Sequence, residues 1–180
     1  MNPRLQRVAV VLPILLLAFI AGRAEWHLGH SETAYFAIRG YDPRDLLRGH
    51  YMTFRLDISP AETIDSCSVS DRECCYCLEQ GDGLETRTIL ARCETARATC
   101  DAFVRTAPLH SFDRFYIPEE GRAAMETTLR QAAQRDRAHL AVAVSESGEP
   151  MIEALLVDGV PIRAAVAAEA EARAAAGESR

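Results

Sequence analysis

Residues 42–56 read DPRDLLRGHYMTFRL and combine a turn, a run of charges and a strand. Pro43 fixes its own φ angle and disfavours the α conformation for Asp42, which is typical of a turn. Polar and apolar residues then alternate from Tyr51 onward, and one face carries Met52, Phe54, Leu56 and Ile58. A period of two predicts a half-buried β-strand, which ends at Pro60.

Similar patterns on both sides of this stretch predict the rest of the domain. The expected strands are Thr33–Arg39, Cys75–Glu79, Leu84–Arg92, Thr99–Arg105, His139–Val144 and Met151–Val157. Gly81-Asp82-Gly83 favours a hairpin turn, and Thr99–Arg105 is expected to pair with Thr86–Cys93. An apolar stripe predicts one amphipathic helix over Glu119–Arg137, formed by Ala124, Met125, Leu129, Ala132 and Ala133. The fold class is therefore α+β and mostly β: an N-terminal transmembrane helix, then a small antiparallel β-rich domain with one helix.

The stretch around Gly49 resembles the signature of the GDYXXLXY family of membrane-anchored bacterial proteins. That signature is Gly-Asp-Tyr, two variable residues, Leu, one variable residue and Tyr. Here Gly49 and Tyr51 match, while His50, Phe54 and Leu56 replace the Asp, the Leu and the final Tyr. The lead-in is also similar, and it consists of Asp42, Pro43, Arg44, Asp45, Leu46, Leu47 and Arg48. Two later blocks, 113–122 and 139–162, extend the resemblance to roughly residues 35–162.

This resemblance implies an anchored protein without an assigned activity, placed among other membrane proteins. The histidine at position 50 shows that a carboxylate is dispensable there, which argues against a catalytic acid at this position. The motif is interpreted either as a structural turn or as a polar surface that binds a partner.

Charge and composition exclude several classes of function. Three arginines and no acidic residue precede Glu25, so the remainder carries 17 Arg against 26 Asp and Glu, a net charge of −9. Such a domain is not expected to bind nucleic acid or an anionic lipid surface. The chain contains no lysine, which excludes Schiff-base chemistry, a P-loop lysine and a Ser–Lys dyad.

The N-terminal segment is predicted to export the domain. Val8–Gly22 is apolar and uncharged, with Arg4 and Arg7 before it and Arg23 after it. If the helix continues to Trp26 or Leu28, it reaches the ~20 residues that a bilayer requires. We expect a single-pass anchor over residues 1–28 in the bacterial inner membrane, an extracytoplasmic domain over 29–162, and an alanine-rich helical or disordered tail over 163–180. A signal peptide cleaved after Ala24 is the alternative.

Six cysteines fall within 34 residues, namely Cys67, Cys74, Cys75, Cys77, Cys93 and Cys100. An even, clustered set in an exported chain is typical of disulfides, although six cysteines allow 15 connectivities. Cys67 and Cys74 are spaced to close one loop, and Cys93 and Cys100 another. The alternatives are free or mixed thiols and a metal site, although the paired Cys-x₂-Cys spacing of zinc ribbons is missing.

No catalytic motif is evident, and no catalytic residue, metal or cofactor is assigned. The candidate residues for a hydrolase are His50, His110 and His139 with Ser59, Ser66 and Ser111. His139 begins a strand and is interpreted as a structural histidine with satisfied hydrogen bonds. The leading hypothesis is therefore a binding or assembly module with an unknown ligand. The alternatives are a redox or metal-handling protein that uses the Cys67–Cys100 cluster, and a hydrolase centred on His50.

Overall fold

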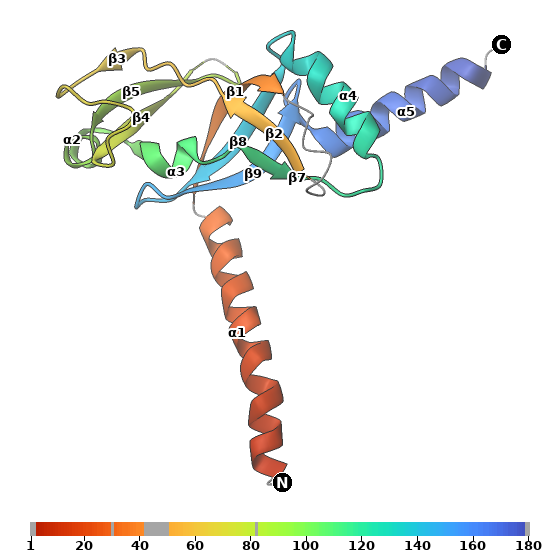
Figure 1. The fold of residues 1–180 in the computed structure, drawn as a ribbon, viewed down its shortest axis with the longest axis horizontal. Coiled ribbons are helices and arrows are strands. Elements are labelled where there is room, and N and C mark those ends of the chain that lie inside the picture. Colours follow the sequence, from red (N-terminus) through yellow and green to blue (C-terminus); the bar gives the residue numbers. More distant parts are fainter. Residues whose placement is uncertain (1–2, 30, 42–50, 82, 179–180) are drawn as a thin grey trace. The chain divides into compact units, whose positions relative to one another are not determined.

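The computed structural model describes residues 3–29, 31–41, 51–81 and 83–178. Internal contacts divide the chain into two compact units, Met1–Ser31 and Glu32–Arg180 (Figure 1). Residues 42–50, which hold the lead-in together with Gly49 and His50 of the signature, lie outside the described part of the chain.

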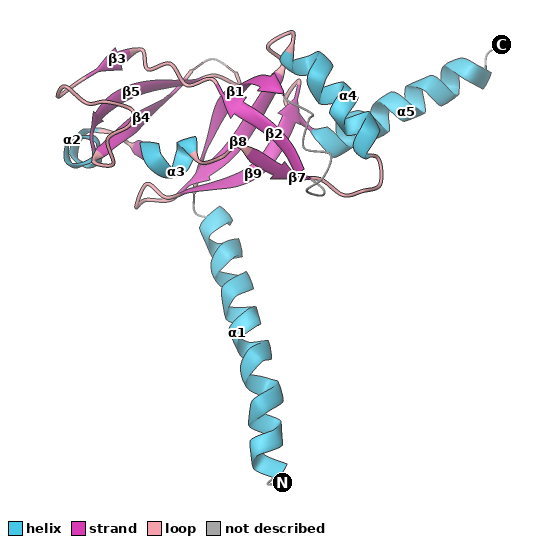
Figure 2. Ribbon diagram, in the orientation of Figure 1, coloured by secondary structure: helices cyan, strands magenta, loops and turns pink. Residues whose placement is uncertain are grey.

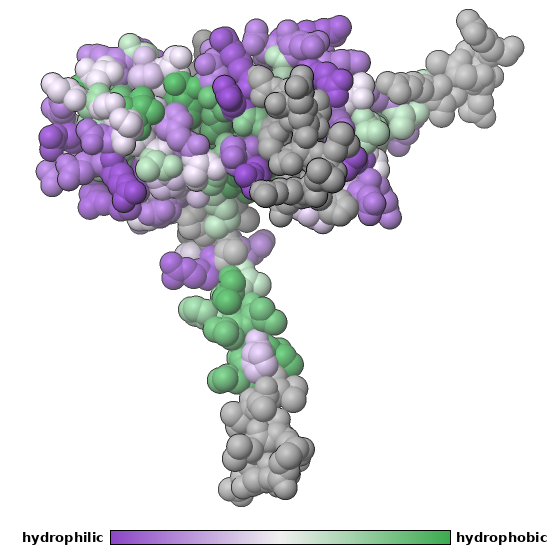
Figure 3. All heavy atoms as spheres, in the orientation of Figure 1, coloured by the Kyte–Doolittle hydropathy of each residue, from purple (hydrophilic) through white to green (hydrophobic). Residues whose placement is uncertain are grey.

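The first unit consists of helix α1, Pro3–Gly29, which contains Pro13. Exposed apolar side chains follow one another along its described middle part, including Leu12, Leu17, Phe19 and Ile20 (Figure 3). Among the described residues, however, no helix is both long enough and apolar enough to cross a membrane. The predicted transmembrane helix is therefore not supported by the structure.

The second unit contains a six-stranded antiparallel sheet in the order β10-β9-β8-β1-β2-β7 (Figure 2). Its strands are β1 Glu32–Tyr41, β2 Tyr51–Leu56, β7 Arg114–Tyr116, β8 Ala138–Val144, β9 Pro150–Val157 and β10 Val160–Pro161. Alternation decides which face of β1 is buried, because Ala34, Phe36 and Ile38 all point into the core. The strands predicted at 33–39, 139–144 and 151–157 are thus confirmed, and β7 and β10 add short edges.

A four-stranded sheet in the order β3-β5-β4-β6 lies in the same unit. It consists of β3 Glu62–Thr63, β4 Cys74–Gln80, β5 Thr86–Arg92 and β6 Ala102–Arg105. The hairpin predicted around Gly81 is confirmed as β4–β5, and β3 adds one parallel pair. The predicted pairing of 99–105 with 86–93 is wrong, because β6 pairs with β4 on its other edge.

Four helices are described in this unit, where the sequence predicted one amphipathic helix and a helical or disordered tail. The predicted helix is present as α4, Arg122–Ala133, and it begins later than Glu119 because Gly121 adopts a left-handed conformation at its N-cap. Met125, Leu129 and Ala132 are buried as predicted, whereas Ala124 is exposed. The helices α2 Cys93–Thr99 and α3 Thr106–His110 were not predicted, whereas α5 Ile162–Glu178 corresponds to the helical alternative for the tail. Ile162 at the start of α5 is buried beside α4, and Thr128 of α4 donates a hydrogen bond to Glu169.

One hydrophobic core joins both sheets with α3, α4 and the start of α5. Phe36 and Leu140 contribute to it from the six-stranded sheet, and Tyr76 and Leu90 from the four-stranded sheet. A second, smaller cluster lies on the other face of β4, where Cys75, Cys77 and Phe103 pack around Ala96 of α2. The two faces of β4 therefore pack into two different clusters, because successive side chains of a strand point to opposite faces.

Candidate functional site

The described part of the signature is structural. The backbone of Tyr51 begins β2 and pairs with Tyr116 of β7. Phe54 is buried in the main core, and its backbone N–H donates to the carbonyl of Asp113. Phe54 thus occupies the inner face of β2, as the alternation predicted. The candidate residues Asp42, Pro43, Arg44, Asp45, Leu46, Leu47, Arg48, Gly49 and His50 lie outside the described residues.

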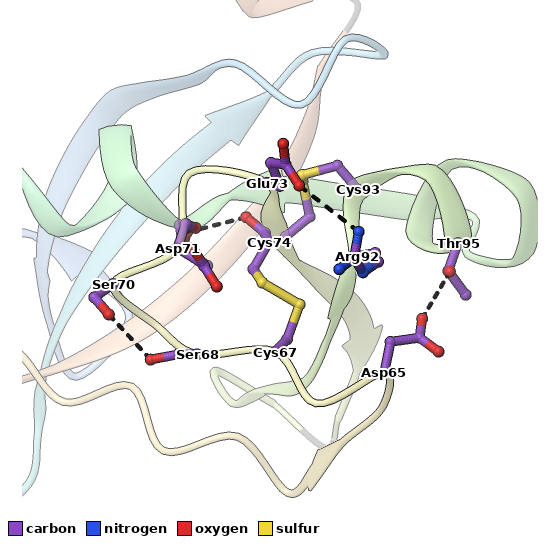
Figure 4. The surroundings of a disulfide bond; sticks show 12 residues. Asp65, Cys67, Ser68, Ser70, Asp71, Glu73, Cys74, Arg92, Cys93 and Thr95 are labelled. Carbon is purple, nitrogen blue, oxygen red and sulfur yellow. Dashed lines mark hydrogen bonds and ion pairs between the residues drawn. A yellow bond between two sulfur atoms is a disulfide. The ribbon is translucent and has the colours of Figure 1, made fainter.

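All six cysteines are paired in disulfides, which supports the disulfide interpretation. The bonds join Cys67 to Cys74, Cys75 to Cys93 and Cys77 to Cys100. The expected closure between Cys67 and Cys74 is present, and Figure 4 shows it beside Arg92 and Glu73.

The expected bond between Cys93 and Cys100 is wrong, and the helix between them explains the error. Cys93 begins α2 and Cys100 is its C-cap, so a rise of ~1.5 Å per residue separates them by about 10 Å. A disulfide tolerates at most about 7 Å between Cα atoms. Both cysteines instead reach across to β4, whose Cys75 and Cys77 lie on one face of the strand. Helix α2 is thereby fixed at both ends to β4.

Tyr76 lies between Cys75 and Cys77 on β4 but faces the opposite way from them, into the main core. Its side chain is fully buried at 0% exposure, and its hydroxyl lies 3.0 Å from Nε2 of His110 in α3. Burial raises the pKa of Tyr76, and burial lowers the pKa of His110. Both groups are therefore neutral near pH 7, and their hydrogen bond joins α3 to β4.

A hollow of about 620 Å³ lies along β1, β5 and the segment that follows β2. Arg39 places its Nε 2.9 Å from a carboxylate oxygen of Asp57 and 3.9 Å from one of Asp136. His139 also lines this hollow, and its buried Nδ1 atom has no hydrogen-bond partner among the residues that the structure describes. The interpretation of His139 as a fully satisfied structural histidine is therefore wrong for this nitrogen.

A larger hollow of about 720 Å³ opens beside the Cys77–Cys100 disulfide. Its apolar wall includes Ile64, Leu78 and Ile89, while the charged side chains that line it are the carboxylates of Glu32, Glu79 and Asp101. Glu79 is paired with Arg87 at 3.8 Å. No sequence pattern predicted this hollow, because its lining comes from five separate segments.

Within the described segments, the geometry gives little support to a metal site or to a hydrolase site. There, no group of three or more His, Cys, Asp or Glu side chains is placed to hold a metal ion. Of the candidate hydrolase residues, His110 bonds to Tyr76, and the hydroxyl of Ser111 donates to the carbonyl of Pro108. His50 lies outside the described residues.

Comparison with known proteins identifies the family of the chain. The sequence model of the GDYXXLXY protein family matches residues 13–155, a range that runs from α1 to β9. No curated protein and no solved structure matches the sequence significantly. The family match covers well over half of the chain and agrees with the residues around Gly49 that resemble its signature. The chain therefore belongs to the GDYXXLXY protein family.

Proposed function

We propose that the β-rich domain acts outside the cytoplasm as a binding or assembly module. The observation that carries the proposal is the pairing of all six cysteines in disulfides, since such bonds persist in oxidising compartments and are rare in the cytosol. The apolar, arginine-flanked segment Val8–Gly22 would deliver the domain there as a single-pass anchor in the inner membrane, or as a cleaved signal peptide. Its partners would then be other membrane proteins.

The hollow beside Cys77–Cys100 is the surface that we assign to this partner. Its volume lies within the ~300–1,000 Å³ of typical ligand sites, and its lining combines the apolar side chains of Ile64, Leu78 and Ile89 with a larger share of polar groups, which suits a polar partner surface. The disulfides hold β4 and α2 together, so little conformational entropy is lost when a partner binds.

Photocrosslinking in intact cells tests this assignment, with a photoreactive amino acid placed at Ile64 or at Val69. The two side chains are matched in exposure at 39% and 38%, but only Ile64 lines the hollow. The expected result is a discrete adduct from position 64, identified by mass spectrometry, and none from position 69. Absence of an adduct at position 64, or equal adducts at both, would contradict the assignment.

Burial of the sulfurs argues against a redox function for the cluster. Each disulfide joins one buried cysteine, namely Cys74, Cys75 or Cys77, to a partly buried one. Attack on the more accessible sulfur would expel a thiolate into apolar surroundings, which raise thiol pKa values and disfavour that leaving group. A thiol reductant should therefore open the bonds only together with denaturant. Rapid opening of one pair in the folded protein would instead support the redox alternative.

A further inference from the structure

Three arginines from separate elements line one small hollow of about 310 Å³ at the end of the four-stranded sheet. Arg72 precedes β4, Arg92 ends β5 and Arg105 ends β6. Arg92 and Arg105 flank the start of β4, where Arg92 is paired with Cys74 on one edge of the strand and Arg105 with Cys75 on the other. The order β5-β4-β6 therefore places both strand ends beside the same end of β4, and the hollow lies there.

The charge of this hollow differs from that of the domain around it. From Glu25 onward the chain carries a net charge of −9, yet the lining of this hollow holds three guanidinium groups against the carboxylates of Glu73 and Glu94. Guanidinium groups present several N–H donors in a fixed plane, which suits the paired oxygens of a phosphate or carboxylate. The lining of the hollow thus carries one more positive than negative group in a domain of negative net charge, while Glu149, outside the lining, pairs with Arg105.

The existing ion pairs leave most of the guanidinium N–H donors of Arg72, Arg92 and Arg105 available for a ligand. Arg92 Nη1 lies 3.7 Å from Glu73, and Arg105 Nη1 lies 3.2 Å from Glu149, so each contact uses one nitrogen (Figure 4 shows the first). Glu73 is 83% exposed, and such pairs contribute at most about 1 kcal/mol. None of the ion pairs found among the described residues involves Arg72. An anion would therefore displace little existing interaction energy.

The backbone that carries these arginines is held rigidly. Disulfides fix Cys74 to Cys67 and Cys75 to Cys93, and the N–H of Cys93 donates to the carbonyl of Glu73 at 2.8 Å. The buried hydroxyl of Thr106 lies within 3.2 Å of the carbonyls on both sides of this segment, those of Asp71 and Cys74. Such a frame fixes the backbone positions from which the three arginines reach the hollow, which preorganises the site at the level of the backbone.

We propose that the hollow formed by Arg72, Arg92 and Arg105 binds an oxyanion of the phosphate class. This site is separate from the acidic hollow assigned to a partner and does not depend on the compartment in which the domain resides. The anion can be free phosphate or a phosphate monoester, or the phosphodiester of a lipid headgroup, which presents the same oxygens with one charge fewer.

Thermal unfolding of the detergent-solubilised full chain tests the site, with inorganic phosphate titrated against sodium chloride at equal ionic strength. The expected result is a saturable rise in Tm with phosphate that chloride does not produce. Arg72→Gln and Arg105→Gln should each weaken phosphate binding roughly tenfold or more, since charge-assisted hydrogen bonds are lost. Arg87→Gln is the matched control, because Arg87 is an exposed arginine on β5 with a comparable ion pair, at 3.8 Å from Glu79.

Dimethyl phosphate, titrated in the same way, distinguishes the two sources of the anion. Stabilisation by this diester equal to that by phosphate assigns a lipid headgroup, and stabilisation by phosphate alone assigns a free phosphate or a monoester; both support the site. Absence of any effect beyond ionic strength overturns the proposal. An effect that is lost equally in Arg87→Gln, or retained in both Arg72→Gln and Arg105→Gln, also overturns it.

Discussion

The hydroxyl of Tyr76 and Nε2 of His110 lie 3.0 Å apart, with their rings tilted at 59°. This contact joins β4, the strand that carries three of the six cysteines, to the short helix α3. Because Tyr76 is fully buried, its hydroxyl has to find its hydrogen bond within the protein. The pair therefore connects the disulfide-bonded region to the main core.

Replacement of Tyr76 by Phe removes this hydrogen bond and keeps the ring. We expect a loss of about 1 kcal/mol in the free energy of unfolding, the usual contribution of one hydrogen bond. Tyr76→Ala should lose about 3–5 kcal/mol, because it also leaves a cavity. Urea denaturation of both variants measures the two losses. Equal losses in the two variants would show that the ring contributes nothing to packing.

Stability should fall on acidification because of His110. Burial lowers its pKa, so the unfolded chain takes up a proton at a higher pH than the folded domain does. The contribution of His110 is complete above its unfolded pKa of about 6.5, and it is lost as the pH falls from there through the lower folded pKa. Urea midpoints between pH 5 and 8 should thus decline less steeply in His110→Asn than in the parent chain. Identical slopes would refute the assignment to His110.

The three disulfides should differ in their contributions to stability. Loss of a bond restores the loop entropy of the unfolded chain, which grows with the separation of the two cysteines. The separation is 7 residues for Cys67–Cys74 and 18 for Cys75–Cys93. Paired replacement by alanine should therefore cost roughly 2 kcal/mol for the first bond and roughly 3 kcal/mol for the second. Chemical denaturation tests the order, and a larger loss from the first pair would contradict it.

Replacement of Gly148 by alanine should destabilise the domain more than replacement of Gly83, a glycine with a similar φ angle. Gly148 has φ +77°, and an added Cβ would lie 2.6 Å from Cε2 of Phe103. Gly83 has φ +73°, and its Cβ would meet nothing within 4 Å. Gly83→Ala should cost about 1–2 kcal/mol through its backbone alone. Gly148→Ala should cost about 1–3 kcal/mol more, because the packing around Phe103 is forced apart. Thermal or urea denaturation compares them, and equal losses would show that the clash with Phe103 is relieved without cost.

Local patterns in the sequence were sufficient to predict several strands. Ala34, Phe36 and Ile38 recur at every second position of β1, and Phe54 of β2 alternates with the polar residues Thr53 and Arg55. Gly81 marks the hairpin turn between β4 and β5. Helix α2 could not be predicted, because Ala96 is its one buried residue and no apolar stripe exists. It is held in place by disulfides whose pairing no local pattern determines.

The candidate sites, like helix α2, could not be predicted from the sequence. Arg72, Arg92 and Arg105 are spread over 34 residues and meet only because β5 and β6 both pair with β4. Ile64 and Asp101 reach the acidic hollow in the same indirect way. The unpartnered Nδ1 of His139 is likewise a property of tertiary packing, since its neighbours in the sequence give no sign of it.

The thiol state of the full chain in intact cells tests the central claim most directly. Cells are treated with an alkylating agent before lysis, and the peptides are analysed by mass spectrometry with and without reductant. The account predicts no alkylated cysteine without reductant, together with peptides that join Cys67 to Cys74, Cys75 to Cys93 and Cys77 to Cys100. Six alkylated thiols in the unreduced sample would contradict both the disulfide-bonded domain and its location outside the cytoplasm.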